Sequence, residues 1–429
     1  MTVKGKRINQ YFLNRCLYIT EALLEYLISL TIAGAFIARL SSYIGLPDEI
    51  TGIITGMTSL GVAFQFLAIY IRIKSVKPTV IAVHVFNQSL FCLLYLIPFF
   101  NISVLAKTII FVTALAVGLA ISNVIAPVKL NWYMKSVDTR CRGVFTAKKE
   151  IVSLIGGMIY TTVLGIFIDR FDSDGMTLRS FIACATAIFA AMALHTLTLI
   201  FSKDVDPNSC EIAMGNEPEF HIDLKYLLTN KKILSVVFIF VLWYISIYMT
   251  TPFFGTYQIK ELGFSMTYIS VISVVSGIIR ALFSIPIGKI ADKYSFKFML
   301  LLSFGILAVA FLFSTFTVPE NGKIFFMIYS VLLAVSYAGI GSASYNLIYE
   351  QFGSENSVPI IAFSNAVSGT VGFLTTLAVS PLIALIQRNG NVIFGIPLYA
   401  QQLVSFIAFL ITVAVIFYLK SAVRTEKRR

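Results

Sequence analysis

The chain has few charged residues. Only 13% of its 429 residues are Asp, Glu, Lys or Arg, whereas 58% are hydrophobic and the mean hydropathy is +0.86. A soluble globule of this length needs more polar surface than this composition supplies. The shortage of charge therefore excludes a water-soluble fold for most of the chain and indicates a protein of the lipid bilayer.

Cysteine and histidine are also scarce. The five cysteines are scattered and form no C-x-x-C pair, so they indicate neither a disulfide framework nor a metal site. The three histidines belong to no H-E-x-x-H motif, and the chain has no G-x-S-x-G motif. We therefore expect no metal, no cofactor and no enzymatic activity.

Long apolar runs recur along almost the whole chain. Each is long enough to cross a hydrocarbon core of roughly 30 Å, which takes about 20 helical residues. All should be helices, because an open strand would leave backbone groups unpaired in lipid. We expect the first run to stay in the protein and not to be a signal peptide, because it carries Glu21 and Glu25. The twelve predicted spans are 17 to 38, 50 to 71, 79 to 100, 108 to 133, 151 to 168, 179 to 201, 233 to 257, 267 to 287, 298 to 316, 324 to 349, 358 to 386 and 402 to 419.

The spans form two similar sets of six. The length of chain from the first span to the basic loop after the second closely matches the length from the seventh span to the loop at Gly288. The segment between the sets is polar. We therefore predict an all-α integral membrane protein with an N-terminal six-helix bundle at 1–201, a cytoplasmic linker at 202–232, and a C-terminal bundle with a basic tail at 233–429.

The 33 lysines and arginines lie mostly in the termini and in alternate loops, which predicts that both termini are cytoplasmic in a multi-pass cell (inner) membrane protein. The net charge of +12 needs no nucleic acid as a partner, because basic residues beside anionic lipid account for it. We expect a monomer. The short loop from Glu350 to Val358 has two acids and no base, but should also be cytoplasmic.

One loop is distinctive. After the eighth predicted span, residues 288–297 read Gly-Lys-Ile-Ala-Asp-Lys-Tyr-Ser-Phe-Lys. This resembles the G-x-L-A-D-R/K-x-G-R-K/R loop of the major facilitator superfamily, and it lies where that superfamily has it. Ser295 replaces the second glycine of the pattern and Phe296 a basic residue. The resemblance implies twelve transmembrane helices in two pseudo-symmetric six-helix bundles, and transport by alternating access.

Two departures from the family bear on function. The matching loop of the first half, residues 70–78, keeps its basic residues but lacks the acid. The fifth span has Gly156 and Gly157 but not the Gly-Pro pattern of proton-antiport drug exporters. The first departure puts a gate at the first-half loop in doubt, and the second disfavours a drug exporter. What the resemblance still implies is a secondary transporter that moves a small organic solute, coupled to protons. The alternatives are a lipid or polysaccharide flippase and, further off, a polytopic membrane enzyme.

Charged residues inside the spans are the first candidates for the working site, since each costs at least about 2.5 to 3.5 kcal/mol at the centre of a membrane helix. Glu25 and Arg280 both lie roughly 10 to 12 Å from the cytoplasmic end of their spans, at 1.5 Å per residue. We predict that they face one another or a shared solute and couple it to protons. Glu21, one turn nearer the surface, is expected to be an interfacial acid.

Further site candidates lie on the fourth and eleventh spans, which the resemblance places around the central cavity. Others lie on the seventh and tenth spans, where proline and glycines allow bends that are typical of a transporter's moving parts and binding site. We predict that polar and aromatic residues there line it or join helices. By the same reasoning, His84, Asn87, Gln88 and His195 fall on outer spans and should not bind the solute. The predicted cavity residues are Asn123, Trp243, Tyr244, Tyr248, Asn346 and Asn365.

The loop at Gly288 is the predicted cytoplasmic gate. Its resemblance to the family implies that Asp292 helps to close that side against the start of the fifth span, with Lys148 or Lys149 as a partner. The gating residues predicted from this resemblance are Gly288, Asp292, Lys293 and Lys297.

Overall fold

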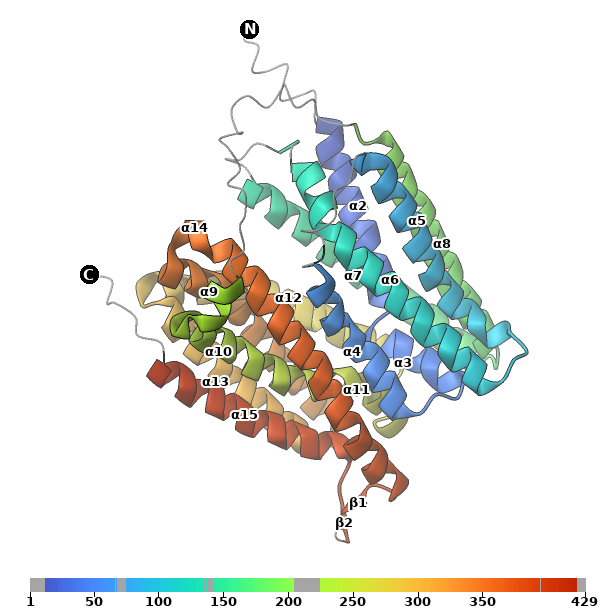
Figure 1. Ribbon diagram of the computed structural model, residues 1–429. Coiled ribbons are helices and arrows are strands. Elements are labelled where there is room, and N and C mark those ends of the chain that lie inside the picture. The colour runs from blue at the N-terminus through green and yellow to red at the C-terminus, as the bar shows by residue number, and fades with distance from the viewer. Residues whose placement is uncertain are drawn as a thin grey trace. The chain divides into compact units, whose positions relative to one another are not determined.

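Helices make up nearly all of the structure, as the need to pair every backbone group within a bilayer requires (Figure 1). The computed structural model describes residues 12–65, 67, 75–134, 136–137, 142–203, 224–393 and 395–422. Within these ranges it leaves out the side chains of residues 131, 134, 142–144, 146–147, 291–292, 342–345, 349, 353–359, 393, 396 and 422.

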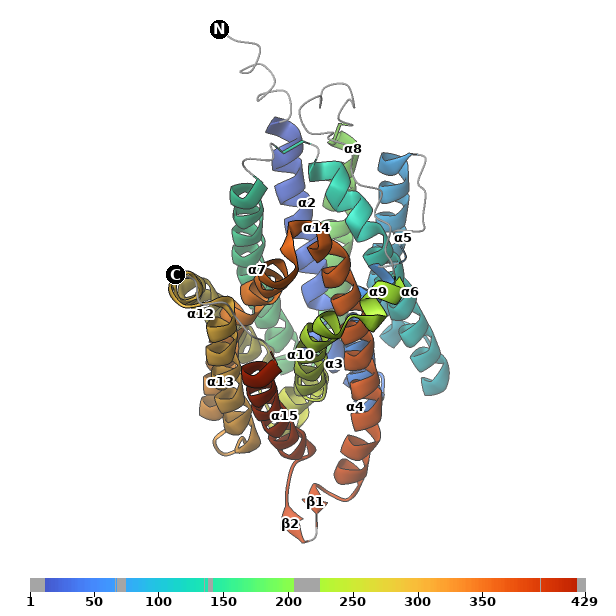
Figure 2. The ribbon, with the colours of Figure 1, turned by 60° about the vertical axis from the view of Figure 1, so that its left-hand side comes forward.

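The chain divides into two compact units. The first takes in residues 1–45 and 64–220. In it α2 packs against α7 and α8, and α5 packs against α6 and α8 (Figures 1 and 2). Its described helices are α2 (Phe12–Thr31), α3 (Gly34–Tyr43), α5 (Val76–Leu96), the 3₁₀ turn η2 (Ile97–Phe99), α6 (Val104–Met134), α7 (Arg142–Ser173) and α8 (Thr177–Phe201).

The second unit takes in residues 46–63 and 221–429. In it α13 packs against α14 and α15, and α14 also packs against α10 and α12. A two-residue antiparallel hairpin pairs Val392 with Pro397 and Ile393 with Ile396. Its elements are α4 (Asp48–Phe64), α9 (Leu224–Thr229), α10 (Lys231–Tyr248), α11 (Thr251–Thr256), the π-helical turn η5 (Tyr257–Glu261), α12 (Met266–Lys293), α13 (Phe296–Thr315), α14 (Gly322–Arg388), β1 (Val392–Ile393), β2 (Ile396–Pro397) and α15 (Ala400–Ala422).

The division into bundles at 1–201 and 233–429 stays a prediction. The contacts of the described chain assign residues 46–63, and so nearly all of α4, to the second unit. Hydrogen bonds support that assignment, because Ser59 Oγ of α4 donates to the carbonyl of Gly369 in α14 at 2.8 Å.

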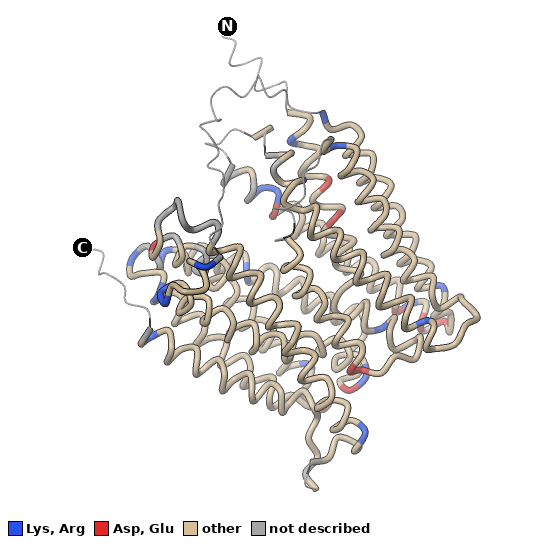
Figure 3. The backbone as a smooth tube through the Cα atoms, viewed as in Figure 1, with Lys and Arg blue, Asp and Glu red and all other residues tan. Residues whose placement is uncertain are grey.

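Ten helical segments of the described chain are long and apolar enough to cross a membrane. Together α2 and α3, bent by 42°, would give an eleventh. The predicted second span, 50 to 71, corresponds to α4, which has 17 residues, and most of the remainder of that span lies outside the described residues. Long stretches of these helices carry no charge (Figure 3), which confirms the predicted all-helical membrane fold.

Two spans are interrupted where the sequence provides a reason. Between α2 and α3, Gly34 has a φ of +54°, which disfavours residues with a Cβ, and the Tyr95 hydroxyl donates to the carbonyl of Thr31 at 2.6 Å. Between α10 and α11, Pro252 lacks the amide hydrogen that would bond Tyr248. The Thr376 hydroxyl of α14 donates to that carbonyl instead, at 2.8 Å. Both interruptions are therefore satisfied by a neighbouring helix.

The prediction of a loop from Glu350 to Val358 is wrong. The backbone is helical throughout α14, which covers both the tenth and the eleventh predicted span. The segment holds no proline before Pro359, so nothing in it removes an amide hydrogen from the backbone ladder. α14 nevertheless reverses direction, as Figure 2 shows, and its two candidate spans are Gly322–Phe352 and Ile360–Arg388.

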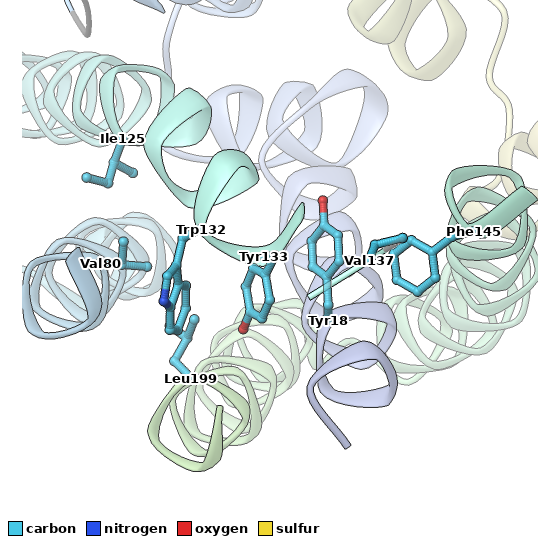
Figure 4. Close-up of a cluster of buried hydrophobic side chains, with 8 residues drawn as sticks. All are labelled: Tyr18, Val80, Ile125, Trp132, Tyr133, Val137, Phe145 and Leu199. Carbon is cyan, nitrogen blue, oxygen red and sulfur yellow. The ribbon is translucent and has the colours of Figure 1, made fainter. Parts of the chain in front are cut away.

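A cluster of aromatic side chains holds one end of the first unit together (Figure 4). The rings of Tyr18 on α2 and Tyr133 on α6 stack with centroids 4.3 Å apart, and Trp132 lies 4.6 Å from Tyr133. The Tyr133 hydroxyl is 3.1 Å from Ser202 Oγ, just beyond α8. These contacts fix the rotation of α2 and α6, and hence the direction of the charged side chains one turn away.

Candidate functional site

Two acids on α2 share one lysine of α6. Lys129 Nζ lies 2.6 Å from Glu21 Oε1 and 2.5 Å from Glu25 Oε2. Glu21 is completely buried, whereas 35% of the Glu25 side chain is exposed. Because the acids are four residues apart, they lie on one face of α2 and meet the same ammonium group.

Two histidines border this pair. His195 Nε2 on α8 is 3.0 Å from Glu21 Oε1, and its Nδ1 is 2.5 Å from Gln88 Nε2 on α5. Since an amide NH₂ only donates, this contact fits the His195 tautomer whose Nδ1 accepts from Gln88 and whose Nε2 donates to Glu21. His84 Nδ1 is 3.9 Å from Glu25 Oε1, and neither of its ring nitrogens has a hydrogen-bond partner in the described part of the chain.

These groups form what we call the charged cluster. With neutral imidazoles it has two negative charges and one positive charge, so it carries a net charge of −1 and becomes neutral on binding one proton. An uncompensated charge in a low-dielectric interior is costly. Its members, contributed by four helices, are Glu21, Glu25, His84, Gln88, Lys129 and His195.

Three members of the cluster have the donor types of a metal site. One ligand atom each from Glu21, Glu25 and His84 lies within 4.8 Å of the others. Lys129 nevertheless places its ammonium within 2.6 Å of both carboxylates, where it supplies the positive charge that a metal would otherwise bring. The cluster is therefore an ion-pair network suited to holding or releasing a proton.

The second unit contains a cavity between α10 and α14. Its empty volume of about 420 Å³ includes space that is open to solvent. The described lining combines aromatic side chains of α10 with an amide and a hydroxyl of α14, and none of the described lining residues is acidic. The lining residues are Phe240, Trp243, Tyr244, Gly341, Ile348, Ser364 and Asn365.

Two nitrogen groups at this cavity have no partner. The buried indole Nε1 of Trp243 makes no hydrogen bond in the described structure. Arg280 of α12 lies beside Gly341, because a methyl group added to that glycine would be 3.9 Å from Arg280 Nη2. Arg280 is exposed and forms no ion pair with any described carboxylate. The cavity can therefore offer hydrogen-bond donors and a positive charge to a bound molecule.

Comparison with known proteins identifies the family. The sequence profile of the Major Facilitator Superfamily matches residues 22–376 and residues 236–427, which is most of the chain. The chain belongs to the major facilitator superfamily. It is therefore a multi-pass secondary transporter and not an enzyme. A search of curated protein sequences finds no match.

Solved structures of major facilitator proteins share the fold. The nucleoside transporter NupG has a TM-score of 0.70 at 14% identity, over 96% of this chain and 100% of its own. A D-xylose-proton symporter has a TM-score of 0.67 at 15% identity, over 96% and 98%. A bacterial homologue of the iron transporter ferroportin has a TM-score of 0.70 at 11% identity, over 98% and 100%. At such low identity these likenesses show the fold alone.

In this major facilitator protein the predicted acid, Glu25, is paired with Lys129. Glu21 is a correction, since it is not interfacial but fully buried between Lys129 and His195. His84, Gln88 and His195 were expected on outer helices away from any site. They lie against the acids instead, and the available signal was their polarity in apolar helices, with His84 and Gln88 one turn apart.

Three of the predicted cavity residues, Trp243, Tyr244 and Asn365, line the same cavity. Their role in binding stays a prediction. Tyr248 stacks on Tyr244 with ring centroids 5.4 Å apart. Asn346 is half-buried in α14 and does not line this cavity.

Asn123 belongs to the first unit, where its amide bonds the carbonyl of Leu119 and the side chain of Gln65. That geometry joins helical segments. A role for Asn123 in binding stays a prediction.

The Gly288 loop is partly helix. Gly288, Asp292 and Lys293 lie in the last two turns of α12, and Ser295 caps α13 by accepting from the amide of Phe298 at 3.1 Å. Serine suits this position because its backbone is extended and its side chain satisfies a free helix amide. Lys297 donates to the carbonyl of Lys420 at 2.9 Å. The side chain of Asp292 lies outside the described residues, so its gating role stays a prediction.

A second group of ion pairs joins α4 to the other elements of its unit. Lys260 in η5 pairs with Asp48, which also accepts from Gln387 Nε2 at 3.0 Å. Arg388 Nη2 bonds Glu49 Oε1 at 3.0 Å. These contacts tie the start of α4 to the end of α14.

Proposed function

We propose that this protein moves a small organic solute across the cell membrane by alternating access and couples the movement to protons, with both termini cytoplasmic. The observation that supports the coupling is the charged cluster, whose two carboxylates share one ammonium. A proton neutralises the cluster, and a charge change at a buried site alters the relative stability of two conformations.

Glu25 is the residue through which the proton enters. Its side chain is partly exposed, whereas Glu21 is sealed, so solvent reaches Glu25 first. A proton on Glu25 removes one of the two ion pairs at Lys129 and leaves the Glu21 pair intact. Loss of the proton restores both pairs. The proton therefore switches the connection between α2 and α6.

The α10–α14 cavity is the proposed solute site. Its aromatic residues lie on α10, the helix that ends before the break at Pro252, and an interrupted helix in a transporter is often the part that moves. A shift of α10 would change the position of Trp243 and Tyr244, which form its aromatic wall. A direct meeting of Glu25 with Arg280 also stays a prediction, since the two residues belong to different units.

Proteoliposome uptake tests this function. Purified protein is reconstituted, a pH gradient is imposed or collapsed, and a broad panel of radiolabelled organic solutes is offered. Gradient-dependent accumulation of at least one solute supports the proposal. If every accumulated solute is indifferent to the gradient, proton coupling is wrong.

Glu25→Gln should abolish gradient-driven accumulation but spare exchange of labelled for unlabelled solute, because the amide cannot cycle a proton. Glu150→Gln is the matched control, since Glu150 is exposed on the same unit and should leave both activities unchanged. Undiminished gradient-driven uptake by Glu25→Gln would exclude Glu25 as the coupling residue.

A further inference from the structure

We infer that the solute is a small planar-ring carboxylate held in the α10–α14 cavity, with its carboxylate at Arg280 and its ring against Trp243 and Tyr244. The inference rests on the proposed function and names its substrate class. It draws on the shape, charge and hydrogen-bond capacity of the cavity.

The aromatic wall favours a flat ring. The rings of Trp243 and Tyr244 meet edge to face with centroids 5.2 Å apart, and Tyr337 meets Trp243 edge to face at 6.1 Å. The arrangement presents both ring faces and ring edges, the two surfaces with which aromatic rings make favourable contacts. Phe240 extends the same wall and has no polar group.

The polar lining is too sparse for a sugar. Among the described side chains at the cavity, only Ser364 and Asn365 are polar apart from the tyrosine hydroxyl and the indole, and Ser364 is 98% buried. A sugar ring brings several hydroxyl groups, and each one left unpaired on binding costs about 1 to 3 kcal/mol. A ring compound with its polar groups at one end avoids that cost.

Arg280 sets the sign of the charge. Its guanidinium lies against Gly341, which lines the cavity, and no described acid pairs with it. A planar guanidinium bonds a carboxylate through two parallel hydrogen bonds, an arrangement that lysine cannot reproduce. A cationic solute would meet this charge with no acid among the described lining residues to balance it.

The Trp243 indole supplies a fourth constraint. Its N–H can only donate, and it has no partner in the described structure, so it requires an acceptor on the solute. A carboxylate oxygen or a ring heteroatom meets that need.

Tryptophan fluorescence tests the inference directly. The chain has two tryptophans, so Trp132→Phe leaves Trp243 at the cavity as the sole reporter. Full-length Trp132→Phe protein in detergent is titrated with benzoate and 2-naphthoate, with benzamide as the neutral ring and cyclohexanecarboxylate as the non-planar anion. We expect saturable quenching by the ring carboxylates and about tenfold weaker binding of both comparison compounds, which corresponds to 1.4 kcal/mol.

Arg280→Gln should weaken benzoate by about tenfold or more and leave benzamide unchanged. The benzoate affinity of Arg280→Lys should lie between those of the wild type and Arg280→Gln. Arg179→Gln, which removes an exposed arginine of the other unit, is the matched control. Calorimetric titration of the wild-type protein repeats the measurement without the tryptophan substitution. Equal affinity for benzoate and benzamide, unchanged benzoate affinity in Arg280→Gln, or no saturable binding of either ring carboxylate overturns the inference.

The two proposals fail separately. Binding in detergent needs no gradient. If ring carboxylates bind but are not accumulated with protons, the proposal of proton coupling is wrong and the proposed solute class is still supported. Gradient-driven uptake of solutes that have neither a ring nor an anionic group would keep the coupling and remove the class.

Discussion

Lys129 is the residue on which the charge balance of the first unit depends. It is 95% buried and holds two carboxylates that would otherwise repel each other. A buried ion pair adds little net stability, but removal of one partner leaves an uncompensated buried charge. Lys129 therefore joins α2 to α6 through two ion pairs while both acids are ionised, and through one when Glu25 is protonated.

Lys129→Met should destabilise the protein by about 3 to 5 kcal/mol, the cost of breaking a buried pair. Adding Glu21→Gln and Glu25→Gln to Lys129→Met should restore much of the loss, because no buried charge then remains unpaired. Thermal unfolding in detergent measures both effects. Lys148→Met, which removes an exposed lysine, is the control. Equal stability of wild type and Lys129→Met would show that the acids do not need the lysine.

Single residues were only partly predictable. Glu25 stands out in the sequence because a charge within an apolar run is costly, and the same argument applies to Lys129 and Arg280. Their partners do not follow from the sequence. Glu21 lies one turn nearer the helix end and resembles an interfacial acid, until the packing of α8 places His195 against it.

At the scale of elements, the break between α10 and α11 positions the aromatic wall of the cavity. Pro252 frees the Tyr248 carbonyl, and Thr376 takes it up from α14. Gly372, one turn before Thr376, allows this close approach, since a methyl group there would lie 2.9 Å from the Tyr248 ring. This side-chain hydrogen bond therefore joins the end of α10 to α14.

Thr376→Val should leave the Tyr248 carbonyl unpaired and cost about 1 to 3 kcal/mol in stability. In a Pro252→Ala background the cost should shrink, because the restored amide of residue 252 can bond Tyr248. Thr375→Val is the matched control, since Thr375 bonds only the carbonyl of Val371 within its own helix. Thermal unfolding is measured for the wild type, Thr376→Val, Pro252→Ala and the double variant. An equal cost of Thr376→Val in both backgrounds would show that Thr376 does not compensate for the amide that Pro252 lacks.

The elements show why prediction succeeds in some places and fails in others. The break at Pro252 is encoded locally, because proline removes a specific hydrogen bond. The reversal within α14 has no such local signal, and the polar segment from Glu350 to Val358 resembles an ordinary loop. The composition alone predicts a membrane protein. The assignment of α4 to the second unit, in contrast, depends on contacts with residues more than three hundred positions away in the sequence.

For the whole molecule, the two proposed sites make a joint prediction about charge movement. The cluster becomes neutral on binding one proton, and the cavity is proposed to bind a solute of charge −1. If each cycle carries one of each, no net charge crosses the membrane. The pH gradient should then drive accumulation, and the membrane potential should have no direct effect.

Valinomycin and potassium gradients test this electroneutrality. An inside-negative potential of 100 mV acts on one net charge with about 2.3 kcal/mol, enough for a roughly 50-fold change in accumulation. We expect no such change for the ring carboxylate that binds best, at a fixed pH gradient. Protein-free liposomes correct for passive leakage, and Glu25→Gln proteoliposomes correct for uncoupled exchange. Accumulation that rises steeply with an inside-negative potential would mean that more than one proton accompanies each anion, and would contradict the one-proton cycle.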